Sequence, residues 1–87
     1  MGCTGLQSIE IGSVGYPVTS YDYRFLQSCT QTSLTVTIYL SSNIDTTLTN
    51  IRRGATNATI IVKAANDIVY NNVSYQAGNT VVTSTPA

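Results

Sequence analysis

The side chains that could act as acids, bases or nucleophiles are few in this sequence. The chain has four carboxylates, a single lysine and no histidine. General acid–base catalysis needs a titrating group near the reacting atom, and a serine or threonine nucleophile needs a base beside it. Hydroxyls are plentiful, but the carboxylates stand far apart along the chain, at Glu10, Asp22, Asp45 and Asp67. We therefore predict that the protein is not an enzyme.

Metal and cofactor chemistry is not indicated either. A zinc site needs clustered Cys and His ligands, and this chain has only two cysteines, Cys3 and Cys29, far apart in the sequence. We predict no metal site and no cofactor. A disulfide between these cysteines would contribute about 3 kcal/mol on the loop-entropy estimate. Because no signal peptide is evident, reduced thiols are the default, and the sequence leaves the pairing open.

The low charge of the chain limits its partners. Charged residues make up 9% of the sequence, against about 25% in a typical domain, and the cations balance the anions. Nucleic acid binding needs clustered Lys and Arg, so we predict none. Arg52 and Arg53 are the only adjacent cations, and they indicate a solvated turn or part of a contact surface. A balanced charge favours association between copies.

Neither a targeting signal nor a membrane span is predicted. The start lacks a basic region followed by an apolar stretch, and no run approaches the roughly 18 apolar residues of a spanning helix. Thr, Ser and Asn make up about a third of the chain, while 43% of the residues are hydrophobic. This composition favours a folded β protein with a hydroxyl-rich surface.

Alternation of apolar and polar residues predicts the first strands. Residues 6–14 and 18–26 alternate in this way, and Gly15-Tyr16-Pro17 separates them. Residues 33–40 give the clearest signal, a half-buried strand. In residues 57–64 three apolar side chains follow one another, which indicates burial on both faces or a position beneath another element.

Two turns are predicted in the C-terminal third. Asn tolerates positive φ, so Asn71-Asn72 suits a two-residue hairpin turn between strands at 68–70 and 73–75. Ala77-Gly78-Asn79 predicts a second turn before a strand at 80–83. This pattern predicts a hairpin followed by one more strand.

Residues 42–54 are compatible with a short helix or with an extended arm. Ile44, Leu48 and Ile51 recur at helical spacing. Ser42 or Asn43 could cap the start, the two arginines suit the carboxyl end of the helix dipole, and Gly54 could end it. Three threonines and an asparagine are poor helix formers, however, so both structures stay open.

Six or seven short strands with turns every eight to twelve residues are typical of a small sandwich or barrel. We therefore predict a single all-β domain over residues 1–87. It would be an antiparallel β-sandwich or barrel, with a short helix or an arm at 44–53. Residues 1–5 and 84–87 are predicted to be flexible or to contact a partner. Because so short a chain has a thin core, a partner subunit would add stability.

Aromatic residues are the best candidates for recognition, because tyrosine combines a flat apolar face with a polar tip. The candidate interface residues, including the arginine pair, are Tyr21, Tyr23, Phe25, Arg52, Arg53, Tyr70 and Tyr75. Two other interpretations of the tyrosines stay open. They are half-buried strand residues between core and solvent, or they stack on glycans.

The segment IVYNNVSYQAGNTVV resembles a hairpin pattern that recurs in small structural proteins of tailed bacteriophages. That pattern has an aromatic strand, a short turn, a second strand with Tyr, and a small residue before Gly. Tyr70, Asn71-Asn72, Tyr75 and Ala77-Gly78 hold these places here. The chain has Asn72 where the pattern more often has Gly, and the resemblance covers under a fifth of its length.

The resemblance implies a virion component: a capsid decoration or cement protein, or a part of a tail or fibre. Its partners would be copies of itself and other virion proteins, and it would assemble in the host cytoplasm without a signal peptide. A short, neutral, Thr-rich β domain without catalytic residues agrees with that function, since neighbouring subunits would cover its sheet edges. The alternative is a carbohydrate-binding or adhesive module that uses exposed tyrosines.

Overall fold

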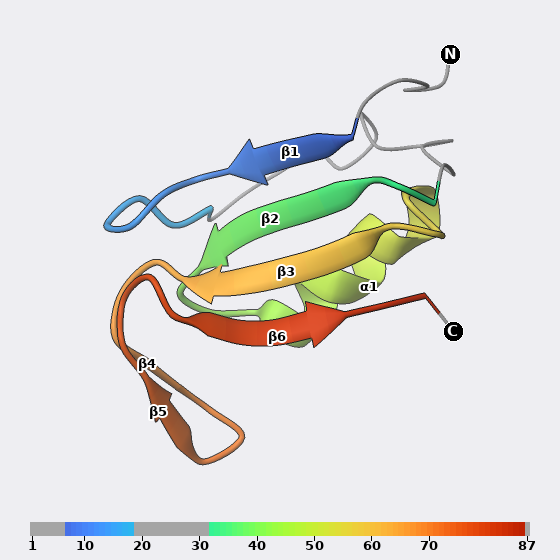
Figure 1. Cartoon of the computed structure of the whole chain (residues 1–87). Coiled ribbons are helices and arrows are strands. Elements are labelled where there is room, and N and C mark those ends of the chain that lie inside the picture. Colours follow the sequence, from blue (N-terminus) through green and yellow to red (C-terminus); the bar gives the residue numbers. More distant parts are fainter. Residues whose placement is uncertain (1–6, 19–31, 87) are drawn as a thin grey trace.

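The computed structural model describes residues 7–18 and 32–86. The fold in these residues is rich in strands and has one short helix (Figure 1). In chain order its elements are β1 (Ser8–Ile11), β2 (Thr35–Leu40), α1 (Ile44–Gly54), β3 (Thr59–Ala64), β4 (Ile68–Tyr70), β5 (Val73–Tyr75) and β6 (Thr80–Ser84).

Four strands form one mixed sheet in the order β1-β2-β3-β6, and β4 and β5 form a separate hairpin. β1, β2 and β3 are parallel, and β6 runs antiparallel to β3. The predicted β-rich fold with one short helix is therefore confirmed, but the main sheet is mixed, so the purely antiparallel sandwich or barrel is wrong. Parallel neighbours need a crossover connection. α1 provides that crossover between β2 and β3, and it covers one face of the sheet in a two-layer arrangement (Figure 1).

The ambiguous segment is the helix α1. Ile44, Thr47 and Ile51 are buried at helical spacing, so tertiary packing outweighs the poor propensity of the threonines. Asp45 lies in the first turn and the two arginines in the last, as the helix dipole favours. Asn43 occupies the N-cap position, but its side chain makes no capping hydrogen bond.

The core lies between α1 and one face of the sheet. Alternate residues of β2, from Val36 to Leu40, are fully buried, which confirms the half-buried strand predicted at 33–40. β3 also alternates: Ile60 and Val62 are fully buried, while Ile61 is half-buried. Of the two alternatives for this segment, a position beneath another element agrees with the structure, because Ile60 and Val62 pack beneath α1 (Figure 1). Burial on both faces is wrong, since Ile61 is only half-buried.

Both turns predicted near the C-terminus are present. Asn71 and Asn72 have φ of 52° and 67°, the left-handed conformation that a two-residue hairpin turn requires. Gly78 has φ of 91° in the second turn, where a side chain would be strained. In the hairpin Ile68 pairs with Tyr75, and Tyr70 with Val73. Tyr70 and Tyr75 therefore share one face of the hairpin.

Several predicted features involve residues that the structure does not describe. The strand expected at 18–26 lies outside the described residues except for Val18, and so do residues 1–5 and both cysteines. Of the predicted terminal segment 84–87, Ser84 is the last residue of β6.

Candidate functional site

β6 forms an edge of the four-stranded sheet, with β3 as its neighbour. An exposed edge offers unpaired N–H and C=O groups to another chain, so proteins often protect it with lysine, proline or a bulge. The sequence of β6, TVVTS, has no charge and no proline. It has a bulge at Val81, since Val62 pairs with Val82 and Lys63 with Thr80. Apart from this bulge the edge is unprotected: no strand among the described residues pairs with the outer edge of β6.

Arg52 fastens the last residue of β6 to the helix. Its Nη2 donates to the carbonyl oxygen and to Oγ of Ser84, at 3.0 and 2.9 Å. Its Nη1 donates to the carbonyl oxygens of Ala55, Thr56 and Ala58, between α1 and β3. The planar guanidinium can serve several acceptors at once. Arg52 is therefore a clamp between three parts of the fold, and a contact with a partner stays a prediction.

Arg53 lies beside this clamp and is exposed. No hydrogen bond or ion pair holds its side chain within the described part of the chain. A cleft of about 400 Å³ opens here between α1 and the end of β6. Its lining residues are Leu48, Thr49, Arg52, Arg53 and Ser84. Two guanidinium groups therefore lie at the Ser84 end of β6. The guanidinium of Arg52 is hydrogen-bonded to carbonyl oxygens of the protein itself, and that of Arg53 has no partner among the described residues.

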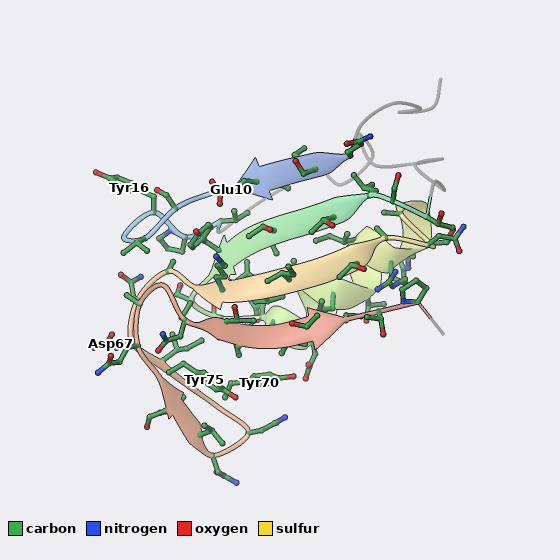
Figure 2. The ribbon with its side chains drawn as sticks, in the orientation of Figure 1. Glu10, Tyr16, Asp67, Tyr70 and Tyr75 are labelled. Atoms are coloured by element: carbon green, nitrogen blue, oxygen red, sulfur yellow. The ribbon has the colours of Figure 1, made fainter. Side chains whose placement is uncertain are left out.

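Asp67 binds the turn that precedes the opposite end of β6. Its Oδ1 accepts a hydrogen bond of 2.9 Å from the backbone N–H of Ala77, in the turn that leads into the strand. The same turn is held to β3 through the carbonyl oxygen of Ala64, which accepts from Gly78 N–H at 2.7 Å. Asp67 is exposed and lies at the opposite end of the sheet from the helix carboxyl terminus (Figure 2).

Tyr70 joins the β4–β5 hairpin to the body of the protein. Its hydroxyl donates a short hydrogen bond to Oδ1 of Asp45, in the first turn of α1. Tyr70 and Ile68 also pack against the hydrophobic core. On the opposite face of the hairpin Val69 is 70% exposed. Val73, which pairs with Tyr70 beside the turn, is 50% exposed. The hairpin therefore projects from the sheet (Figure 1), and Tyr70, next to its turn, ties it to α1.

The bond to Asp45 raises the pKa of the Tyr70 hydroxyl above its ordinary value, because ionisation would break a hydrogen bond to a carboxylate. Desolvation and the negative charge of Asp45 act in the same direction. Since the folded-state pKa exceeds the unfolded one, the contribution to stability is complete below about pH 10 and is lost as the pH rises through the folded-state value.

We expect an ultraviolet titration to give Tyr70 a pKa above the ordinary value of tyrosine. The contribution of Tyr70 is identified by comparing the wild-type chain with Tyr70→Phe. Asp45→Asn should lower that pKa, because it removes the negative charge of the carboxylate that accepts the Tyr70 hydrogen bond. Tyr75→Phe is the matched control on the same face of the hairpin. A Tyr70 that titrates at or below its ordinary value in the folded protein would contradict the bond.

The face of the sheet that no described element covers, here called the uncovered face, is polar. Thr35, Thr37 and Thr59 are half-buried on it. The Tyr39 hydroxyl donates to Oε2 of Glu10 at 3.4 Å, and Nζ of Lys63 lies 6.0 Å from the centre of the Tyr39 ring. Lys63 thus leans towards β2, away from the edge strand β6. The hydroxyl-rich surface predicted from composition lies on this face.

Comparison with known proteins gives no relative. No family model, no curated protein and no solved structure matches this chain. The described residues contain no group of three or more His, Cys, Asp or Glu side chains that could hold a metal ion. In the same residues, no helix is long and apolar enough to cross a membrane.

The structure separates the predicted interface residues. Tyr21, Tyr23 and Phe25 lie outside the described residues. Tyr70 and Tyr75 are half-buried on one face of the hairpin, and Arg52 and Arg53 lie in the last turn of α1. Sequence reasoning missed β6 as an edge and Asp67 as the group at its start. The run TVVTS gave no signal of an edge position, because edge strands usually carry a charge or a proline and this one has neither.

Proposed function

We propose that the protein is a non-enzymatic structural subunit that assembles through the outer edge of β6. The observation that carries this proposal is an uncharged strand whose outer edge is open among the described residues. Adding a strand to such an edge gives main-chain hydrogen bonds at little further cost, because the backbone is already extended. Zero net charge and a thin core both favour association with further copies.

The particle that we propose is a virion of a tailed bacteriophage, in which the chain is a capsid decoration or cement protein or a tail or fibre component. Two features support this. The hairpin segment resembles a pattern in such proteins, and the hairpin projects from the sheet with exposed valines (Figure 1). Other virion proteins would be further partners of these surfaces.

Sedimentation velocity at increasing protein concentration tests the assembly edge. We expect the wild-type chain to self-associate and Thr83→Lys to weaken that association about fivefold or more, because charges on an edge strand oppose pairing. Thr83 is exposed, so the folded monomer should tolerate the change. The matched control is Thr46→Lys, which adds the same charge at an exposed position of α1 and should leave association unchanged.

Two outcomes would count against the proposal. One is a stable monomer at all concentrations that binds a glycan array, which supports the carbohydrate-binding alternative. The other is self-association that Thr83→Lys and Thr46→Lys reduce equally, which would place the contact elsewhere. Thermal melts of both variants confirm that each is folded.

A further inference from the structure

Charges of opposite sign flank the two ends of β6. Arg52 binds the backbone of Ser84, and Arg53 lines the cleft beside it, so two positive charges stand at the carboxyl end of the strand. At the other end Asp67 holds the turn before Thr80. Asp45 adds negative charge at that end, because it lies in the first turn of α1 and the arginines lie in the last. The edge therefore carries a charge gradient along its length.

The two ends are far enough apart to act separately. Five residues at the rise of an antiparallel strand place the first and last Cα atoms of β6 about 14 Å apart. This separation exceeds the Debye length of about 8 Å at physiological ionic strength. A partner strand laid along β6 would therefore interact mainly with the acidic group at one end and with the basic groups at the other.

Other charged groups near the edge do not cancel the gradient. Lys63 pairs with Thr80 in the ladder, but its ammonium lies over the Tyr39 ring, towards β2 and on the uncovered face of the sheet. Glu10 is on β1, at the opposite side of the sheet. The basic end keeps Arg53 available, because the described chain offers it no partner.

We propose that the occupant of this edge is β6 of a second copy of the chain, running antiparallel about a twofold axis. In that arrangement the Ser84 end of each strand meets the Thr80 end of its partner, so Arg53 of each copy faces the partner's Asp67. The contact is isologous, and the charge pair forms twice. A parallel arrangement would put the arginines of the two copies side by side. The sheets would join into one continuous eight-stranded sheet.

The cleft beside Ser84 suits this pairing. Its lining combines Arg53 with hydroxyl groups and has room for a carboxylate side chain from the partner. Short strands bury little area, so we expect a weak pair in dilute solution that many simultaneous contacts strengthen in a particle. This pairing rests on the proposed function, because it identifies the partner that binds at the same β6 edge.

Charge reversal tests the orientation. Arg53→Glu and Asp67→Lys should each weaken self-association about tenfold or more, because each variant turns both attractive pairs into repulsive ones. Mixed in equal amounts, the two variants should form a heterodimer as tight as the wild-type pair. In that heterodimer the two introduced side chains, a carboxylate and an ammonium, face each other, and the native Asp67 faces the native Arg53. Native mass spectrometry resolves the species, because the variants differ in mass. Lys63→Glu is the control and should leave association unchanged.

Asp67→Lys also removes the acceptor of the Ala77 N–H bond, so its thermal melt is needed. If that variant does not fold, Asp67→Asn keeps an acceptor oxygen, and Arg53→Glu should pair with it more tightly than with itself. Self-association that responds to Thr83→Lys but is indifferent to charge reversal would overturn the antiparallel pairing and keep the assembly edge. A wild-type chain that never self-associates would overturn both proposals.

Discussion

Replacing Ile60 with alanine should destabilise the protein by about 3 kcal/mol, because a fully buried branched side chain leaves a cavity that its neighbours fill only in part. Ile60 lies in β3, between β2 and β6 and on the face of the sheet that α1 covers. A domain of this size has a small margin of stability, so we expect a large part of the population to be unfolded near body temperature. Urea unfolding followed by circular dichroism measures the loss.

Ile61 is the matched control for Ile60. It has the same side chain in the next position of the same strand, but it is half-buried on the uncovered face. We expect Ile61→Ala to cost about 1 kcal/mol, since less apolar surface is lost and no closed cavity forms. Equal effects of the two substitutions would mean that both faces of β3 are buried, and the two-layer arrangement would then be wrong.

Arg52→Ala should cost about 3 kcal/mol, although the residue lies in the last turn of the helix and next to an exposed arginine. The substitution removes five hydrogen bonds donated by a charged group, four of them in partly buried positions. The end of β6 would lose its link to α1. We expect a lower urea midpoint for the variant than for the wild-type chain. We also expect the substitution to speed amide hydrogen exchange more in β6 than in β2.

Arg53→Ala is the control for the clamp and should change stability by less than about 0.5 kcal/mol, because exposed side chains without partners contribute little. Arg52→Lys should recover only a small part of the loss. A single ammonium group cannot reach both the Ala58 carbonyl and Ser84 as the forked guanidinium does. Full recovery with lysine would mean that charge alone, and not the geometry of the clamp, stabilises the fold.

The alternation of single strands could be predicted from the sequence because burial on one face leaves a direct trace. Residues 33–40 alternate strictly, and the same apolar residues form the core. Asn71-Asn72 also predicted its turn, since few residues tolerate the left-handed backbone at two successive positions. Both features depend only on neighbouring residues.

The pairing of the strands could not be predicted in the same way. Antiparallel pairing followed from treating the helix at 42–54 as optional, because Thr46, Thr47 and Thr49 lower its helix propensity. Burial of Thr47 and Ile51 against the sheet decides the helix, and this is a property of the whole fold. Once the helix exists, a strand, a helix and a strand in succession favour parallel neighbours.

The candidate site could not be predicted for the same reason, because it depends on the helix that the sequence left open. Adjacent residues on a helix point about 100° apart, so Arg52 and Arg53 have different surroundings. From the sequence alone the two arginines looked equivalent. The structure distinguishes them, with Arg52 bound to internal carbonyls and Arg53 exposed.

The clamp between Arg52 and Ser84 has a consequence for the order in which the chain folds. β2, α1 and β3 are contiguous in the sequence, whereas the clamp joins residues 32 positions apart. Loop closure favours the contiguous unit first, so β6 and its clamp form late. Interactions that form after the transition state slow unfolding more than they speed folding. Arg52 therefore lengthens the lifetime of the folded protein, a property that the assembly we propose would require.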